Sequence, residues 1–483
     1  MIVLNCATGS IDPYSPSPDM PWNKQRVQHL FRRLGYGASH AEMEAALLQD
    51  PQTLIDQMLD DAIAAPLTTA PVWANWTILD YDDFNEQLGE QYAEWLTTWT
   101  KDMLLGNSLR ERITLFWHNH LVTLIDSYAC PPYMYQYHKI LQENALGNFR
   151  DLVYEMGTSS AMLVFLNGNL NSSASPNENY ARELYELFTL GRDNGYDQND
   201  IAETARALTG FVGRSVDCGP FFFVDVLHDT GEKTIFGQTG NWGYDDVHEL
   251  LFTQRADQIA TYICTKIYQV FVNPDVDENI VEALATTFKT NNFELAPVFR
   301  QLFKSEHFFD EAHFSTVIKN PIELLLTFYK EAQIPFDDDQ RALELAYYAL
   351  FLGQQLFNPP DVSGWPGDQA WIDTSSLPNR WQANLIFLLI QFENRPEQLV
   401  DLAKVLSNNS NDPAYVSQVF IEYFIPSGLQ TPEDYDRATT VFKWEVPQNY
   451  YDDELWNLDW DTAPTQITLL IYHLIRIPEF QLS

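Results

Sequence analysis

The chain has 483 residues, of which 45% are hydrophobic, enough for a large buried core, and this excludes a disordered protein. Its 28 Lys and Arg against 67 Asp and Glu give a net charge of −39, so its surface repels phosphate backbones and anionic lipids, and no nucleic-acid partner is expected. No apolar run reaches roughly 18–20 residues, the length that a transmembrane segment needs.

The first 22 residues are predicted to form an extended lead-in. Residues 7–22, ATGSIDPYSPSPDMPW, are rich in Pro and Ser, which interrupt helices. The start, MIVLNCATGS, lacks a basic segment, and its apolar run is too short for a complete signal peptide. Two interpretations of Cys6 stay open: part of an ordinary disordered N-terminus, or the remnant of a lipoprotein cleavage site.

Helical signals dominate from residue 23 onward, so the predicted fold class is mainly α: one large multi-helix domain. Ser39 and Glu42 form a capping-box pattern, in which each side chain satisfies the backbone N–H of the other residue. Shorter helices are expected towards the C-terminus. Apolar residues recur at helical spacing in the segments 23–37, 39–49, 51–64, 83–105, 108–121, 132–147, 149–157, 177–190, 197–209, 245–271, 277–289, 293–304, 319–333, 337–353 and 378–393.

Two segments break this pattern. Residues 220–237, PFFFVDVLHDTGEKTIFG, combine a β-rich aromatic run with an Asp-Thr-Gly-Glu turn and predict a small β-hairpin insert. Residues 356–380 are too rich in Pro and Gly for a helix, and an irregular loop of that length is usually functional or wraps the core. A composition shift near residue 395 separates the main helical domain, 23–395, from an acidic helical C-terminal extension, 396–483, which we expect to pack on it.

The segment NENYARELYELFTLG, 177–191, predicts a helix with two unlike faces. Asn177 follows Pro176 and is a good N-cap residue. On the polar face, an i, i+4, i+8 ladder of alternating charge stabilises a helix by roughly 0.2–0.5 kcal/mol per pair. This polar arc is either a solvated surface or a covered face that serves a site, and it consists of Asn177, Glu178, Asn179, Arg182, Glu183 and Glu186.

His118 and His120, in the motif FWHNH, lie two residues apart on a predicted helix. Side chains at that spacing point about 200° apart, so they do not bind one metal ion unless the helix ends there. His120 shares the apolar face with Ile113 and Phe116, where a histidine is more often a core residue than a ligand. Because histidine titrates near neutral pH, a role as general acid or base stays open.

His228, Asp229 and Lys233 surround the turn of the predicted hairpin. Turn geometry alone accounts for an Asp followed by Thr-Gly. It accounts less well for His228 and Lys233, which are candidates for contacting an anionic group or the polar arc. In the motif GWPG, Trp365 is a candidate platform for a sugar ring, although such a tryptophan more often caps a core.

Established catalytic and cofactor motifs do not occur in the sequence. There is no P-loop, no G-x-G-x-x-G after a strand, no G-x-S-x-G and no H-E-x-x-H. Without a C-x-x-C pair, the spacing leaves disulfide pairing open among Cys6, Cys130, Cys218 and Cys264. The cofactor stays unknown, with two alternatives: none, or a single bound metal ion whose candidate ligands are His118, His120 and Glu186.

An ordered set of motifs covers roughly residues 25–395: RLGYGAS, RERITLFWHNHLV, LGNFRDLVYEMGTSSAMLVFLNG, NENYARELYELFTLG, GYDQNDIAETARALTGF, HDTGEKTIFG and LGQQLFNPPDVSGWPG. This set resembles a large bacterial family of uncharacterised proteins, domain of unknown function 1800. Some members carry His where this chain has Phe188, so no role is carried over to that side chain. The resemblance implies an exported or envelope-associated protein, often encoded beside a sulfatase-like companion of the alkaline phosphatase superfamily. It implies no known reaction.

The family motif also keeps the whole polar arc of 177–186, which favours a covered face with a purpose, catalytic or structural, over a solvated one. A buried ion-pair network would be a structural purpose.

Two functional hypotheses follow. The first is an extracytoplasmic, enzyme-like protein with a polar site for an anionic or sugar-derived substrate, in which Arg182 and Lys233 hold the anion and a Glu–His pair moves protons. Its predicted catalytic residues are Arg182, Glu183, Glu186, His120 and His228. Its predicted substrate-binding residues are Asn177, Glu178, Asn179, Asp229, Lys233 and Trp365. The second hypothesis is a non-catalytic accessory or scaffold protein of the cell envelope, working with the sulfatase-like companion or a polysaccharide.

Overall fold

The computed structural model describes residues 9–336 and 338–483, and within these residues the protein is mainly helical. They contain 23 α-helices and two small antiparallel sheets, which confirms the predicted fold class of a helical protein with a small β-hairpin. Cys6, and with it the lipoprotein hypothesis, lies outside the described residues. Among the described helices, none is long and apolar enough to span a membrane.

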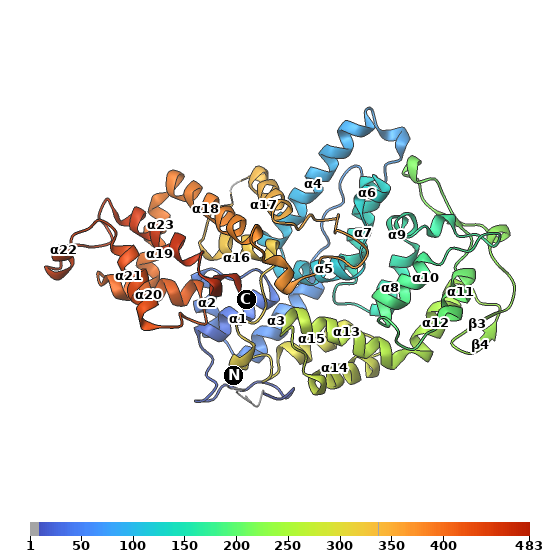
Figure 1. Ribbon diagram of the computed structural model, residues 1–483, viewed down its shortest axis with the longest axis horizontal. Helices are drawn as coiled ribbons and strands as arrows, with labels where there is room; N and C mark the ends of the chain where they lie inside the picture. Colours follow the sequence, from blue (N-terminus) through green and yellow to red (C-terminus); the bar gives the residue numbers. More distant parts are fainter. Residues whose placement is uncertain (1–8, 337) are drawn as a thin grey trace.

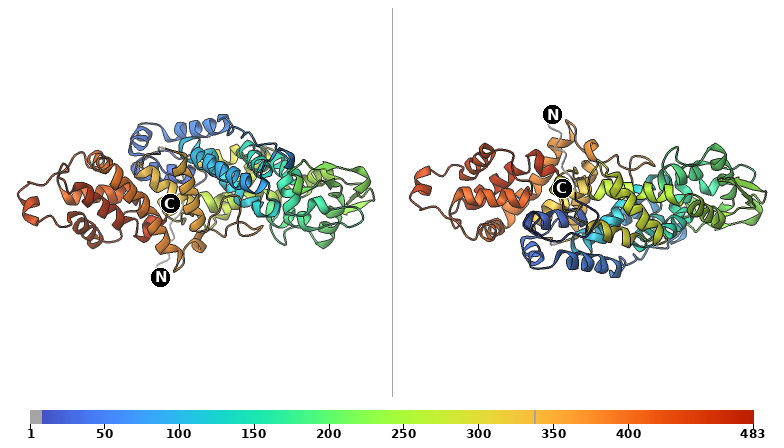
Figure 2. Two further views of the ribbon diagram at one scale, coloured as in Figure 1. Left: turned by 90° about the horizontal axis from the view of Figure 1, so that it is seen from above. Right: turned by 90° about the horizontal axis from the view of Figure 1, so that it is seen from below.

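The molecule is elongated, with α22 at one tip and the strands β3 and β4 at the other (Figures 1 and 2). The helices of the first half are α1 Lys24–Leu34, α2 His40–Leu47, α3 Pro51–Ala64, α4 Phe84–Leu105, α5 Ser108–His120, α6 Ile125–Tyr128, α7 Pro131–Glu143, α8 Phe149–Thr158, α9 Ser160–Phe165, α10 Asn179–Glu183 and α11 Gln198–Ala207. Those of the second half of the main body are α12 Tyr244–Gln254, α13 Ala256–Phe271, α14 Glu278–Thr290, α15 Leu295–Phe303, α16 Pro321–Glu331, α17 Asp339–Phe351 and α18 Ser376–Asn394.

Helix α5 is buried in the middle of this body, where it packs against α3, α4 and α7. Every residue of it from Leu109 to His118 is buried. Full burial of a large apolar side chain stabilises the fold by roughly 1.5–3 kcal/mol, and α5 contributes several. Its enclosed carboxylate, Glu111, accepts hydrogen bonds from Trp99 Nε1 and Gln142 Nε2, both at 2.9 Å. The helix ends at His120, which leaves the last turn at the edge of the core.

The predicted hairpin is present, but its strands pair differently. Strand β3, Lys233–Ile235, pairs with β4, Gln238–Gly240, so the tight turn lies at Phe236 and Gly237. Both turn residues have positive φ angles, 50° and 76°, as a two-residue hairpin turn of this kind requires. The aromatic run contributes β2, Phe222–Phe223, which pairs with β1, Phe211–Val212. The Asp-Thr-Gly-Glu segment joins the two small sheets.

Two predicted helices are also divided. The segment 245–271 forms α12 and α13, because Arg255 between them leaves helical geometry with φ −130° and ψ 23°. The segment 177–190 is α-helical only over α10, and Leu184–Thr189 continues it as a wider π-helical turn. The Thr189 hydroxyl donates to the Leu184 carbonyl five residues earlier, which stabilises the wider turn.

The segment 396–483 forms a helical group at the α22 tip that packs on the main body (Figure 1). Arg32 of α1 pairs with Glu331 of α16 at 2.7 Å and also donates to the Phe424 carbonyl at 3.0 Å. Gln28 donates to the Tyr423 carbonyl at 2.7 Å. The helices of this group are α19 Pro396–Leu406, α20 Pro413–Phe424, α21 Pro432–Lys443, α22 Gln448–Asp452 and α23 Ala463–Leu474.

Candidate functional site

A cleft with a volume of about 430 Å³ opens between α5, α13, the start of α16 and the irregular loop after α17. Part of the long loop predicted at 356–380, residues 362–371, forms one wall. The lining combines aromatic rings with amides and charged groups, as ligand pockets commonly do. Its aromatic and polar members are Arg112, Phe116, Asn119, His120, Tyr262, Lys266, Gln269, Asn320, Glu323, Gln354, Ser363, Trp365, Asp368 and Trp371.

Asn119 fixes the loop that carries Trp365. The Trp365 backbone N–H donates to Asn119 Oδ1 at 2.7 Å, and Asn119 Nδ2 donates to the Trp365 carbonyl at 3.4 Å. Gly364 makes this approach possible, since it has φ +81° and a Cβ there would lie 2.5 Å from the Asn119 carbonyl oxygen. The motifs FWHNH and GWPG, distant in the sequence, therefore build one wall of the cleft together.

His118 supports the same loop from inside the core. Its ring stacks on the indole of Trp365, with centroids 5.3 Å apart and planes 8° from parallel. His118 Nε2 accepts the Phe357 backbone N–H at 3.0 Å, so the neutral ring carries its proton on Nδ1 and has no lone pair left for a metal. Burial lowers its pKa to about 3, and the ring is neutral at physiological pH.

His120 faces the cleft, and one of its nitrogens is available there. His120 Nε2 lies 2.9 Å from the Phe188 carbonyl oxygen, which only accepts, so the proton is on Nε2 and Nδ1 carries a lone pair. Burial lowers the pKa of His120 to about 4; the hydrogen bond to Phe188 opposes this shift and the nearby Lys266 adds to it. At neutral pH His120 is therefore a hydrogen-bond acceptor and a weak base.

The π-helical turn of the NENYARELYELFTLG segment reaches the cleft through its backbone. The Leu187 carbonyl accepts the Tyr262 hydroxyl at 3.0 Å, while the next carbonyl, that of Phe188, binds His120. Leu187, Tyr262 and His120 all line the cleft. The wider turn thus supplies two neighbouring carbonyls that orient two lining side chains, and π-helical turns are frequent at functional sites.

A buried ion pair between Arg112 and Glu323 lines another part of the cleft. Their side chains are 4% and 6% exposed. Glu323 is placed by local sequence, because Asn320 and Glu323 form the capping box that starts α16, with Asn320 Oδ1 accepting the Glu323 N–H at 2.9 Å. Arg112 Nε has no hydrogen-bond partner within the described part of the chain. The protein therefore fixes the position of the ion pair, while the N–H at Arg112 Nε stays available to donate a hydrogen bond.

The polar arc of the 177–191 segment lies outside this lining. Arg182 pairs with Glu178 at 2.8 Å and with Glu186 at 3.3 Å, the ladder that the spacing predicts. The side chains of Arg182 and Glu178 are 35% and 38% exposed, so this part of the arc is a partly solvated surface. Asn177 Oδ1 accepts the Asn179 N–H at 3.0 Å and so acts as a local cap.

Glu183 and Glu186 are less exposed than the rest of the ladder. Burial raises the pKa of Glu183, with the neighbouring Glu186 carboxylate as the next cause. Glu186 is 16% exposed, and it also contacts Arg192 at 3.5 Å.

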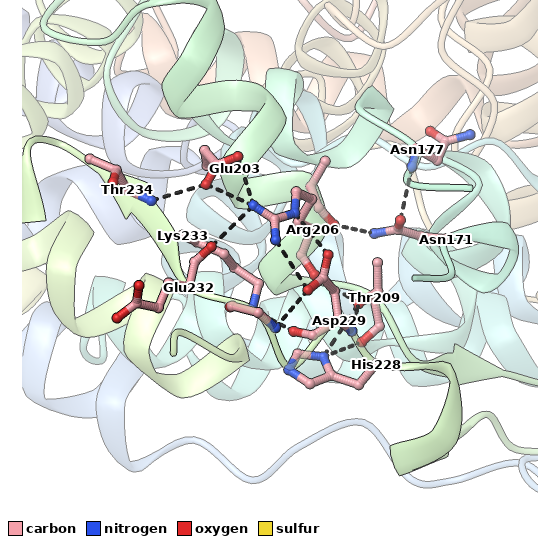
Figure 3. Close-up of polar contacts among 12 residues, drawn as sticks. Asn171, Asn177, Glu203, Arg206, Thr209, His228, Asp229, Glu232, Lys233 and Thr234 are labelled. Atoms are coloured by element: carbon pink, nitrogen blue, oxygen red, sulfur yellow. Dashed lines mark hydrogen bonds and ion pairs between the residues drawn. The ribbon is translucent and has the colours of Figure 1, made fainter. Parts of the chain in front are cut away.

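The hairpin residues gather around Arg206 of α11 (Figure 3). Arg206 Nε donates to Asp229 Oδ2 at 2.8 Å, and Arg206 Nη1 donates to Glu203 at 2.9 Å. Lys233 is buried and donates to the backbone carbonyls of Asp229 and Gly231. Burial lowers the pKa of Lys233, with Asp229 opposing that shift. The pKa of Asp229 is lowered, chiefly by its hydrogen bond from Arg206.

His228 and Asn177 connect this network to its surroundings through backbone bonds. His228 Nδ1 donates to the Thr209 carbonyl at 2.9 Å, and the Asn177 N–H donates to Asn171 Oδ1 at 2.8 Å (Figure 3). The charged groups of Arg206, Asp229 and Lys233 are thus bound by other protein groups, which favours a structural role for this network.

The predicted site residues thus occur in three places: His120 and Trp365 in the cleft, Asn177 to Glu186 just before α10, on α10 and on its π-turn, and His228 to Lys233 around Arg206. No hydrogen bond or ion pair joins side chains of one group to those of another within residues 9–336 and 338–483. The described residues also contain no group of three or more His, Cys, Asp or Glu placed to hold a metal.

Sequence reasoning missed Arg112, Glu323 and Lys266 as lining residues. One signal for Arg112 was present, since Arg112, Phe116 and His120 follow one another at i, i+4 and i+8 and so share a helix face. Asn119 lies beside that face, within the same motif. Glu323 and Lys266 stand in segments that read as ordinary amphipathic helices, and only the packing of α13 and α16 beside α5 brings them to the cleft.

The protein is therefore mainly helical and has a polar cleft of the size of a small ligand. The motifs FWHNH and GWPG, distant in the sequence, build one wall of this cleft. The chain belongs to the family described as protein of unknown function (DUF1800), whose family model matches residues 29–482. This match confirms the resemblance and extends it over the C-terminal helices. No curated protein and no solved structure matches the chain.

Proposed function

We propose that the protein is an extracytoplasmic, enzyme-like protein whose cleft binds a sugar-derived ligand. The observation that carries this proposal is the lining: Trp365 and Trp371 lie in the same cleft as the amides of Gln269, Asn320 and Gln354. Tryptophan rings offer flat apolar faces for sugar C–H groups, and amides exchange hydrogen bonds with hydroxyls. The volume of about 430 Å³ is in the range of small-molecule sites.

The groups that could carry out chemistry on such a ligand are His120 and the Arg112–Glu323 pair. His120 offers an unprotonated Nδ1, which accepts a hydrogen bond from a hydroxyl and is a weak base, because burial lowers the pKa of His120 to about 4. Glu323 offers a carboxylate held in place by Arg112. In our proposal, these residues replace the other predicted catalytic residues as the centre of the site: Arg182, Glu183, Glu186 and His228.

The disulfide between Cys130 and Cys218 supports a location outside the cytoplasm. Their Cα atoms are 5.8 Å apart, and the bond closes over 88 residues of chain. Structural disulfides persist in oxidising compartments and are rare in the cytosol. The sulfatase-like companion, which the family resemblance implies, and a polysaccharide stay proposed partners, chiefly under the scaffold alternative below.

Sugar binding is testable by calorimetry with a panel of neutral disaccharides. Trp371→Ala removes one aromatic face of the cleft, and we expect it to weaken binding by up to about tenfold, since losing an aromatic contact costs roughly 0.5–1.5 kcal/mol. Trp444→Ala is the matched control, because Trp444 is 46% exposed on the C-terminal helical group. If no sugar in the panel binds, or if both variants bind like the wild type, the proposal is wrong.

A scaffold role is the second candidate, and an exposed apolar strip beside β2 favours it. Phe222, Phe223 and Val226 are 59%, 45% and 82% exposed. Neighbouring apolar side chains at such exposure often mark a contact surface for another protein. Loss of partner co-purification in a Phe222→Ser, Val226→Ser variant with unchanged sugar binding would support the scaffold role independently of the cleft.

A further inference from the structure

Lys266 differs from every other lysine in the described chain in having no ion pair and no hydrogen bond. All the others either pair with a carboxylate or donate to an oxygen. This is unexpected in a protein with 67 Asp and Glu, where a carboxylate is rarely far from a cation. The Lys266 ammonium lies over the ring of Tyr262, 5.4 Å from its centroid.

The unpaired ammonium of Lys266 lies where a ligand could reach it. It lies on α13, partly buried, and lines the cleft. Burial lowers its pKa, and no nearby carboxylate opposes that shift. Removing a charge from water without a partner costs free energy, which the protein recovers only when an anion arrives.

Gln269 extends the same surface by one turn. Residues three apart lie on one face of a helix, and both Lys266 and Gln269 line the cleft. The Gln269 amide makes no hydrogen bond among the described residues, so its N–H groups are available. An ammonium beside an amide N–H is a set of donors suited to an oxyanion.

The other cation of the cleft is already neutralised. Arg112 forms its buried ion pair with Glu323, so the local charge of that pair is close to zero. The other two charged groups of the lining, Lys266 and Asp368, form no ion pair with each other in the described part of the chain, so the Lys266 ammonium is the cation of the cleft that is left without a partner. Because the whole chain carries −39, an anion is repelled at long range, and only a local cation can make the cleft prefer one.

We infer that Lys266 and Gln269 form an oxyanion subsite, and that the sugar-derived ligand of the cleft therefore carries an acidic group such as a carboxylate or a sulfate ester. This inference rests on the proposed function for the nature of the ligand, but the subsite itself rests on Lys266. His120 Nδ1, on the neighbouring wall, accepts a hydroxyl of the same ligand.

The test compares pairs of disaccharides, each neutral sugar with its uronate form, by calorimetry on the full chain. We expect the best uronate to bind about tenfold more tightly than its neutral partner, the gain of one charge-assisted hydrogen bond. Lys266→Met should abolish that difference. Lys289→Met is the matched control, because Lys289 on the adjacent α14 already pairs with Asp257 at the surface, and it should keep the difference.

A second measurement separates an anion attached to a sugar from a free anion. Lys266 is acetylated with an amine-reactive reagent such as acetic anhydride, and the extent of acetylation is measured by peptide mass spectrometry. The reaction is run with inorganic sulfate, with a uronate disaccharide, or with sodium chloride as the reference, all at the same ionic strength. We expect protection by the uronate sugar to exceed protection by sulfate. Equal protection by sulfate alone would mean a free-anion site and overturn the assignment to an acidic sugar.

The two proposals fail in different ways. If neutral and uronate sugars bind equally, and Lys266→Met changes neither, the oxyanion subsite is overturned while sugar binding stands. If no sugar binds but sulfate protects Lys266, the subsite stands as an anion site and the proposed sugar ligand is wrong. If nothing binds and nothing protects Lys266, both are overturned.

Discussion

Gly364 and Gly367 bracket the Trp365 loop and differ in what surrounds them. Both have positive φ angles, +81° and +70°, which cost a residue with a side chain about 1–2 kcal/mol. Around Gly367 a Cβ would meet nothing within 4 Å, whereas at Gly364 it would lie 2.3 Å from Asn119 Oδ1. We expect Gly367→Ala to lower the free energy of unfolding by the conformational cost alone. Gly364→Ala should lower it by at least about 2 kcal/mol more, because the added methyl group breaks the hydrogen bonds between Asn119 and Trp365.

Urea denaturation of both variants measures this difference, and ligand binding reports on the loop. If Gly364→Ala is no less stable than Gly367→Ala, the contact between Asn119 and the loop does not hold the wall in place. The pairing of the two glycines controls for backbone strain, because both substitutions add the same methyl group at a positive φ.

At the residue scale, the sequence predicted two lining residues of the cleft but did not indicate three charged ones, Arg112, Glu323 and Lys266. His120 and Trp365 stood out because each belongs to a motif with unusual polar or aromatic content. Lys266 did not, since its significance is a missing partner, and a missing partner is visible only when the surrounding helices are in place. The opposite holds for Lys233, whose polar neighbours in the sequence suggested a site while its ammonium is in fact bound to backbone carbonyls.

At the scale of elements, the Arg206 network and the Arg182 ladder look alike in sequence but differ in what they hold. Arg206 joins α11 to the segment before β3, and the N–H of Thr234 in β3 donates to its partner Glu203 at 3.0 Å (Figure 3). Arg182 joins residues of its own helix and Gln198. We expect Arg206→Met to cost about 2 kcal/mol of unfolding free energy and Arg182→Met at most about 0.5 kcal/mol.

This comparison also tests the earlier candidate site. Calorimetry with a sugar that binds the wild type should give unchanged affinity for Arg182→Met. A large loss of affinity without a loss of stability would show that the polar arc of 177–186 takes part in binding after all, and would restore Arg182 as a substrate-binding residue.

The disulfide joins the start of α7 to a loop that Tyr133 of α7 also contacts, through a hydrogen bond to the Gly219 carbonyl and a ring contact with Phe221. Cys130 precedes α7, and Cys218 lies in the loop between β1 and β2. For a closed loop of this length, chain entropy predicts a stabilisation of about 4–5 kcal/mol. We expect Cys130→Ser to lower the melting temperature. Peptide mapping of non-reduced protein should find the Cys130 and Cys218 peptides linked; finding both as free thiols in protein from its native compartment would contradict an extracytoplasmic location.

At the scale of the whole molecule, helical periodicity was sufficient to predict the class of the fold and most helix positions. It failed where a helix changes type or direction, as in the π-turn at 184–189 and the break at Arg255, because those depend on tertiary partners. Arg255 donates to the Gly195 carbonyl and lies over the Phe236 ring at 4.3 Å, contacts that no local pattern reveals. The position of the cleft was beyond prediction for the same reason.

The large negative charge and the buried histidines have opposite effects on the free energy of unfolding when the pH falls. Burial lowers the pKa of His118 and His248 to about 3 and contributes most to lowering that of His120 and His313 to about 4. In the unfolded chain each titrates near 6.5. Below that value the unfolded state binds more protons than the native state, so each such histidine removes up to about 1.4 kcal/mol of stability per pH unit.

Carboxylates are still ionised between about pH 6.5 and 5, so relief of their mutual repulsion comes only at lower pH. We therefore expect the free energy of unfolding to fall as the pH decreases through this window. His248 provides the test, because it is buried against Tyr154 and Tyr244, and neither of its ring nitrogens has a hydrogen-bond partner among residues 9–336 and 338–483. His248→Phe keeps an aromatic ring at this position but removes the group that takes up a proton on unfolding. The free energy of unfolding of this variant should therefore fall less steeply with decreasing pH, by the equivalent of about one proton. Urea denaturation at several pH values would show this, and equal slopes for the variant and the wild type would mean that His248 is already protonated in the native protein.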